Sequence, residues 1–152
     1  MRIHTFTANL TLPLPIEQVF QFFADAQNLE RITPPFLKFR IVSPLPIEMR
    51  RGVRIRYQLR LHGIPIGWES DITAWEPPHR FVDEQSSGPY RMWHHEHRFT
   101  QTAAGTEVSD RIDYAVLGGS LINSLFVEPD VRKIFAYRTQ RLNELMVGNG
   151  SK

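Results

Sequence analysis

Three of the six histidines in this 152-residue chain fall within four positions, in the segment Trp-His-His-Glu-His-Arg-Phe at residues 93–99. In a β-strand alternate side chains share a face, so Trp93, His95, His97 and Phe99 would point to one side of a sheet. Two aromatic rings and two imidazoles on one face fit the wall of a cavity better than a dry core or a wet surface. Imidazoles exchange protons near neutral pH and also bind metals. We therefore expect a container for a small molecule.

The turns that flank this segment predict which residues face the histidines. A tight turn at residues 103–105 predicts these facing pairs: Phe99 with Val108, His97 with Asp110, His95 with Ile112 and Trp93 with Tyr114. A turn centred on Gly88 predicts a second set: Gln85 with Arg91, Asp83 with Trp93 and Phe81 with His95. The expected ligand-binding residues are Trp68, Phe81, Asp83, Gln85, Arg91, Trp93, His95, His97, Phe99, Asp110, Tyr114 and Phe135.

A pair between His97 and Asp110 would satisfy two buried polar groups at once. The carboxylate would fix the tautomer of the imidazole and raise its pKa. Such a pair serves either as an acid–base catalyst or as a polar cluster that only holds two strands together. A metal ion held by His95 and His97 with Asp110 or Asp83 is a further alternative. We expect no metal and no cofactor, because His-x-His on a strand is common without metal and the third ligand is not specified.

Composition limits the function classes. The chain is 41% hydrophobic and 22% charged, has a formal net charge of +2 and contains no cysteine. These values predict one globular domain over residues 1–147, without disulfides or thiolate chemistry, in the cytoplasm. There is no basic run that would indicate nucleic acid as a partner, and Arg54, Arg56 and Arg60 alternate as a solvated strand face would. No apolar run is long enough for stable membrane insertion.

Alternation and turn residues predict strands at residues 3–12, 36–43, 53–62, 64–75, 79–85, 90–100 and 106–117. Helical spacing predicts two short helices, at residues 16–24 and 25–32, and a long one at residues 120–147 with a kink near Pro129. Residues 148–152 are expected to form a flexible tail.

Some side chains outside the cavity face also carry expectations. On the long helix, one of Arg138 and Arg141 could reach an anionic group of a ligand, but we expect both to extend along the surface to solvent. Trp75 and Met92 would be exposed on the outer face of the sheet, where they could mark a self-association patch and make the protein a homodimer.

The order strand, two short helices, six strands and long helix indicates an α+β fold, in which a curved antiparallel sheet of about seven strands encloses a cavity with the C-terminal helix. This order resembles the helix-grip fold of the SRPBCC superfamily, which includes START lipid-transfer domains, Bet v 1 allergens and polyketide cyclases. The local pattern resembles an uncharacterised bacterial ligand-binding branch of that superfamily, which is polyketide cyclase/dehydrase-like. The pattern runs Trp68…Ile72, Phe81-x-Asp83-x-Gln85-x-x-Gly88-Pro89-Tyr90, Trp93-x-His95-x-His97-x-Phe99 and Val108-x-Asp110.

The resemblance implies that a small hydrophobic or amphipathic ligand, of lipid, polyketide or quinone type, is bound or transported in the cavity. The alternative is a cyclase or dehydratase that uses His97 and Asp110 as an acid–base pair. A third reading is a partner domain with a vestigial cavity.

Overall fold

The computed structural model describes residues 2–148 and contains one seven-stranded antiparallel sheet. Its strands are β1 (His4–Leu12), β2 (Arg40–Ile41), β3 (Arg54–Leu61), β4 (Ile64–Glu76), β5 (Arg80–Ser87), β6 (Met92–Thr102) and β7 (Gly105–Ala115). They are ordered β1-β7-β6-β5-β4-β3-β2, so the first strand of the chain pairs with the last. This arrangement confirms the expected α+β sheet.

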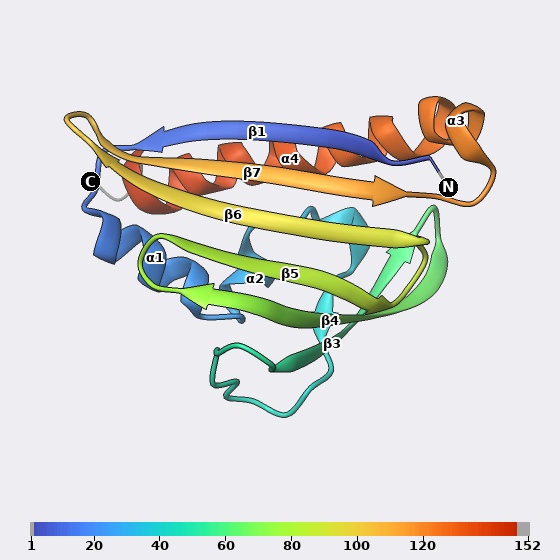
Figure 1. The fold of residues 1–152 in the computed structure, drawn as a ribbon, viewed down its shortest axis with the longest axis horizontal. Helices are drawn as coiled ribbons and strands as arrows, with labels where there is room; N and C mark the ends of the chain where they lie inside the picture. Colours follow the sequence, from blue (N-terminus) through green and yellow to red (C-terminus); the bar gives the residue numbers. More distant parts are fainter. Residues whose placement is uncertain (1, 149–152) are drawn as a thin grey trace.

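The helices lie on one side of the sheet and at its ends (Figure 1). They are α1 (Ile16–Ala24), α2 (Asn28–Arg31), the 3-10 turn η1 (Pro35–Leu37), α3 (Gly119–Ile122), the π-helical turn η2 (Asn123–Val127), α4 (Glu128–Asn143) and a final π-helical turn η3 (Glu144–Gly148). The long helix α4 runs behind the sheet along its length, as a helix-grip fold requires. Of the expected tail, Gly148 belongs to the last turn, and residues 149–152 lie outside the described part of the chain.

Two predicted elements are shorter than expected because local backbone chemistry ends them. The strand predicted at residues 36–43 is reduced to β2, since Pro35 begins a 3-10 turn that ends at Lys38 in a left-handed conformation with φ of 47°. Asp25 does accept the capping hydrogen bond from the Gln27 backbone N–H at 3.0 Å, but the helix begins only at Asn28. The backbone N–H groups of Asn28 and Leu29 bond to carbonyls three residues back, at 2.9 Å and 3.1 Å, so the chain between Asp25 and Asn28 is a turn. Pro129 lies in the first turn of α4, where its missing N–H costs little.

The hairpin between β6 and β7 has the register that the sequence predicts. Phe99 faces Val108, His97 faces Asp110, His95 faces Ile112 and Trp93 faces Tyr114. Gly105 holds this turn with φ of +133°, and a side chain there would overlap the backbone of Leu12. A residue other than glycine at this position would therefore disturb the strand that carries Asp110.

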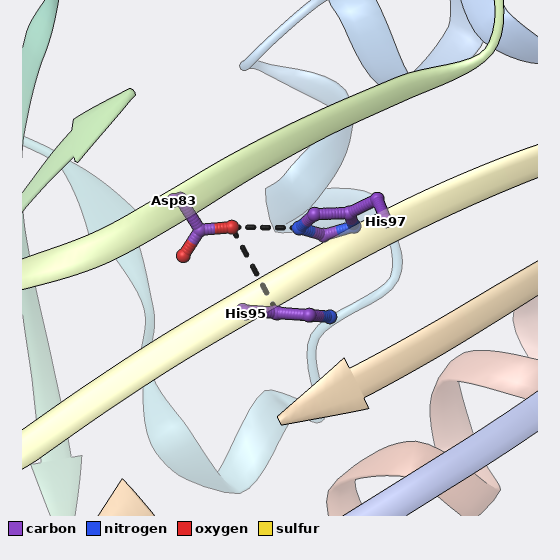
Figure 2. A group of neighbouring side chains, drawn as sticks. All are labelled: Asp83, His95 and His97. Carbon is purple, nitrogen blue, oxygen red and sulfur yellow. Dashed lines mark hydrogen bonds and ion pairs between the residues drawn. The ribbon is translucent and has the colours of Figure 1, made fainter. Parts of the chain in front are cut away.

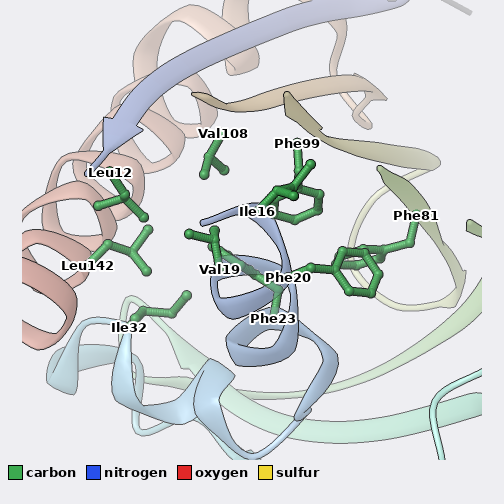
Figure 3. Close-up of a cluster of buried hydrophobic side chains, with 10 residues drawn as sticks. All are labelled: Leu12, Ile16, Val19, Phe20, Phe23, Ile32, Phe81, Phe99, Val108 and Leu142. Atoms are coloured by element: carbon green, nitrogen blue, oxygen red, sulfur yellow. The ribbon is translucent and has the colours of Figure 1, made fainter. Parts of the chain in front are cut away.

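The main core fills one end of the molecule, between α1, the end of α4 and the sheet (Figure 3). Phe20 of α1 packs its ring against Phe81 and Phe99 of the sheet, and Phe23 also reaches Phe99. The spacing of the buried residues in α1 is helical, which is why this helix was predictable with its observed bounds. The core fixes the end of β6 that leads into the histidines.

Replacement of Phe99 by alanine should lower the free energy of unfolding by about 3–5 kcal/mol, because its ring is 2% exposed and leaves a cavity when removed. Phe36, which is 53% exposed, is the matched control, and Phe36→Ala should cost less than about 1 kcal/mol. Urea unfolding followed by tryptophan fluorescence measures both. Equal losses in the two variants would contradict this assignment of the core.

Candidate ligand-binding cavity

A cavity of about 200 Å³ lies between the concave face of the sheet and α4. Seven of the predicted ligand-binding residues line it: Trp68, Phe81, Asp83, Trp93, His95, His97 and Phe135. Most of the wall is apolar. One group of polar side chains lies where β5 and β6 meet, opposite Arg138 of α4, and a second group, Asp25, Asn28 and Thr33, lies at and beside α2. The predicted hollow between sheet and helix is therefore present, with both imidazoles turned toward it.

The other five predicted residues lie outside the cavity wall. Phe99 belongs to the main core, and Asp110 lies behind His95, where both are buried. Tyr114 is buried and its hydroxyl donates to Asn123 at 2.8 Å. Arg91 is exposed, so the structure gives it no part in the wall.

Gln85 holds the loop between β5 and β6. Its side chain accepts a hydrogen bond from the Tyr90 backbone N–H at 3.0 Å and donates to the Tyr90 carbonyl at 2.7 Å. The predicted register of this hairpin is wrong by two residues: Asp83 faces His95, and Phe81 faces His97. The loop is longer than a tight turn at Gly88 because β6 begins only at Met92. A shift of two residues keeps every side chain on its predicted face.

This register moves Asp83 into the centre of the site. His97 Nε2 lies 2.6 Å from Asp83 Oδ2, and His95 Nδ1 lies 3.8 Å from the same oxygen (Figure 2). His95 Nε2 is hydrogen bonded to Asp110 Oδ1 at 2.8 Å. The predicted His97–Asp110 contact exists only as an ion pair at 3.4 Å from Nδ1, without hydrogen-bond geometry. Each imidazole is thus paired with a different carboxylate.

The prediction that Arg138 extends along the surface is wrong. Its side chain is buried between α4 and the sheet, and Nη2 donates to Asp110 Oδ1 at 3.2 Å. The guanidinium also lies over the rings of Phe23 and Phe135, at 5.3 Å and 5.2 Å. A buried carboxylate requires a compensating charge, and Arg138 supplies it from the helix. Arg141 does point outward, to Glu144 at 2.8 Å.

Burial and charge divide the two histidines into different protonation states. Burial lowers the pKa of His97, but the carboxylates of Asp110 and Asp83 outweigh it and raise the pKa above its usual value. Burial and the neighbouring charge of His97 lower the pKa of His95. Of the two imidazoles, His97 therefore holds a proton more readily than His95.

Both carboxylates stay ionised despite their burial. Burial raises the pKa of Asp83. The hydrogen bond from His97 and the charges of the two histidines and Arg138 outweigh this effect, so the pKa lies below its usual value. The pKa of Asp110 is held well below its usual range, because Arg138 and the histidines outweigh the effect of burial. Two negative groups, Asp83 and Asp110, thus face the guanidinium of Arg138 and the two imidazoles, of which His97 has the raised pKa.

The rings of the site form a stack. Phe81 lies parallel to His97 with a centroid distance of 4.0 Å, and His97 lies against His95 at 3.7 Å. Phe135 of α4 closes the stack at 5.8 Å from the His95 ring. This packing holds both imidazoles in fixed orientations, so the donor and acceptor atoms are positioned before any ligand arrives.

The sequence analysis misplaced two aromatic residues, of which Tyr90 lines the cavity and Trp75 packs on the main core. Tyr90 was assigned to the outer face, but it lies outside any strand and turns inward, and burial raises the pKa of its hydroxyl. Trp75 was expected on the surface, but it packs against Phe20 and Phe81. The register of β4 shifts between Ile72 and Ala74, and this irregularity turns Trp75 inward. The alternation of apolar residues in β3 places Tyr57 on the cavity side, so this pattern could have predicted one more wall residue.

The distances between the donor atoms of the polar side chains bear on the alternative of a metal site. One donor atom from each of Asp83, His95 and His97 lies within 4.8 Å of the others (Figure 2). These three residues are the ones that could hold an ion. The Nε2 atoms of both rings are already hydrogen bonded to carboxylates, so an ion here would displace the bond between His97 and Asp83.

Similar proteins agree with this architecture. A crystal structure of a Chromobacterium violaceum protein matches with a TM-score of 0.74 at 14% identity, covering 95% of this chain and 99% of that one. A Mycobacterium smegmatis protein matches with a TM-score of 0.69 at 20% identity, over 93% and 89% of the two chains. An aromatase/cyclase from a Streptomyces species matches with a TM-score of 0.67 at 17% identity, over 96% and 98%.

No curated protein matches the sequence of the chain. No helix among residues 2–148 combines the length and the apolar character that a membrane span needs. The model of the family described as "Polyketide cyclase / dehydrase and lipid transport" matches residues 12–142, which include both histidines and both carboxylates. The chain therefore belongs to the polyketide cyclase/dehydrase and lipid transport family, within the SRPBCC superfamily of helix-grip proteins.

The pairing of Asp83 should make stability depend on pH in a defined direction. Because its pKa is lowered on folding, its contribution is present above pH 4, the usual value for an unfolded Asp, and is lost as the pH falls. Asp83→Asn should therefore cost about 3–5 kcal/mol of unfolding free energy at pH 6, and less at pH 3. Urea unfolding at both pH values measures this difference.

Asp71→Asn is the matched control. Asp71 is paired with Arg54 at 2.7 Å on the outer face, and both side chains are accessible to solvent. An exposed pair contributes about 1 kcal/mol or less. A cost for Asp83→Asn that does not exceed this control at pH 6 would show that the buried pair does not form.

Proposed function

We propose that the protein binds a small hydrophobic or amphipathic ligand, of lipid, polyketide or quinone type, in the cavity between the sheet and α4. The observation that carries this proposal is an apolar enclosure with one preorganised polar corner, at Asp83, His95 and His97. Ligand sites commonly combine a hydrophobic wall with a few oriented polar groups.

The size of the cavity limits what it encloses. A dry cavity of about 150 Å³ admits benzene, so a cavity of about 200 Å³ encloses a group of about one or two rings or a short branched chain. A longer ligand would extend its remaining part through an opening of the cavity. The enclosed part would be apolar on most sides.

The polar corner favours a ligand with a hydroxyl or another hydrogen-bond donor. Asp83 Oδ2 is occupied by His97, whereas Oδ1 accepts no hydrogen bond from residues 2–148. The side chain of Asp83 is 19% exposed, against 6% for that of His97, and it lines the cavity. A ligand hydroxyl would therefore donate to Asp83, and His97 would keep that carboxylate ionised.

Filling the cavity should abolish retention of the ligand. Leu59 lines the cavity and is 8% exposed, so Leu59→Trp would occupy the enclosed space. Purified protein is incubated with a lipid and quinone extract, and native mass spectrometry measures the bound mass. The wild type should retain a ligand and the variant should retain at least tenfold less, with thermal melting to confirm that it is folded.

Val42→Trp is the matched control, because Val42 is 40% exposed and lies outside the cavity wall. It should retain the ligand as the wild type does. Failure of the wild type to retain any component of the extract, or equal loss in both variants, would contradict the proposal.

A second candidate, catalysis of cyclisation and dehydration, is favoured by the contact of His97 with Asp83 at the cavity wall. The His97 imidazole has a raised pKa and lies 2.6 Å from this carboxylate, which is nearer than the predicted partner Asp110. In a β-polyketone, a carboxylate or His95 would take a proton from the carbon between two carbonyls, and that carbon would form a bond to the carbonyl carbon that it attacks. His97 would protonate the oxygen of the attacked carbonyl to give a hydroxyl. His97 would then take the second proton of the same carbon while the protonated base returns its proton to the hydroxyl, which leaves as water as the double bond forms.

His97→Gln should separate the two candidates. Glutamine can still donate a hydrogen bond to Asp83 but cannot transfer a proton. For a catalyst, turnover of a synthetic β-polyketone thioester, followed by liquid chromatography, should fall by about 10²–10⁴-fold while binding is kept. Absence of turnover in the wild type, with ligand retained, would leave the binding function alone.

A further inference from the structure

A second hollow, of about 260 Å³, lies directly beside the cavity. Its walls come from the turn η1, from the hairpin between β3 and β4, and from the beginning of α4. Leu37, Leu61 and Ile134 border both the hollow and the cavity, so the two spaces share part of their walls. The hollow therefore adjoins the cavity, and we call it the mouth.

Large apolar side chains are exposed around this mouth. Phe36 of η1 is 53% exposed, and Ile64 at the hairpin is 62% exposed. Phe126, one helical turn before Asp130, is 54% exposed. These three residues come from three separate segments and define what we call the apolar rim. Exposed apolar side chains that gather at one opening mark an interaction surface.

Basic side chains are attached to the same rim. The ammonium group of Lys133 lies 5.0 Å from the centre of the Phe36 ring, and Arg60 donates to the carbonyl of Gly63 at 2.9 Å, next to Ile64. The acidic residue of the mouth, Asp130, is paired with His62 at 2.8 Å. The rim therefore combines apolar side chains with two cations, Lys133 and Arg60, and one acidic residue, Asp130.

The segment before α4 extends this surface. Residues 116–127 contain no charged side chain. Leu117, Leu121 and Leu125 are 66%, 69% and 59% exposed, while Asn123 of the same segment is buried. In Figure 1 this segment, with α3, lies at the same end of the long axis as the hairpin between β3 and β4. The three leucines therefore add exposed apolar surface at this end of the molecule.

We propose that the apolar rim docks on the surface of an anionic lipid bilayer, so that the mouth of the cavity faces the lipid. This rests on the proposed binding function, since a hydrophobic ligand would then pass between bilayer and cavity without crossing water. The exposed side chains enter the headgroup region, and Lys133 and Arg60 pair with anionic headgroups. A second copy of the chain fits less well, because a symmetric contact brings the same basic patch against itself.

Sedimentation with vesicles tests the docking without any added ligand. Vesicles of phosphatidylcholine with phosphatidylglycerol should bind the wild type, and vesicles of phosphatidylcholine alone should bind it at least tenfold more weakly. The double variant Phe36→Ser/Ile64→Ser should lose about tenfold or more in affinity for the anionic vesicles, because two apolar side chains no longer enter the bilayer. Arg60→Glu/Lys133→Glu should remove the preference for anionic lipid.

The matched control is Val42→Ser/Leu45→Ser, which changes two exposed apolar residues away from the mouth, 40% and 48% exposed. It should bind as the wild type does, and all variants should keep the wild-type melting temperature. Absence of vesicle binding, or equal loss in the control, overturns the docking proposal. So does light scattering that shows a dimer in the wild type and a monomer in the rim variant.

The vesicle assay and the ligand-retention assay test the docking and the binding function separately. Protein that retains ligand but ignores vesicles refutes the docking alone, whereas protein that binds vesicles and retains no ligand refutes the function.

Discussion

The structure depends on the charge balance of one buried cluster. Asp83, His95, His97 and Asp110 project from three neighbouring strands, and Arg138 reaches them from α4. Each charge would be costly in an apolar interior by itself, and the removal of any one leaves another unpaired. The cluster therefore couples the sheet to the helix, and both line the ligand-binding cavity. Any ligand would meet the polar groups at the seam where these two layers are joined.

The same balance determines what chemistry the cavity offers. Arg138 and His95 both contact Asp110 through Oδ1, and Asp110 does not line the cavity. Asp83 has only His97 as a close partner and keeps one oxygen open to the cavity. A symmetrical arrangement would have left both carboxylates equivalent. The helix breaks this symmetry, because it supplies its guanidinium on one side only.

The sequence predicted local elements well and long-range partners poorly. The hairpin at residues 103–105 is tight, so the alignment of His97 with Asp110 followed from counting. The loop before β6 is not tight, because Gln85 holds it open through the Tyr90 backbone, and counting failed there by two residues. The period of two still gave the correct face, since an even shift preserves it. Arg138 could not be placed at all, because its partner lies 28 residues away on another layer.

Trp75 shows the same limit from the opposite direction. One irregularity in the pairing of β4 moves it from the outer face to the core, and no residue type in that strand announces the change. The register of β6 and β7 determines that the histidines point to the concave face of the sheet. The depth of the ligand-binding cavity depends on how α4 lies across these two strands. That position depends in turn on Phe135 and Arg138, whose contacts are with the imidazole stack and Asp110. Helix position and cavity chemistry are therefore one property of this fold, and a substitution in the polar cluster would alter both.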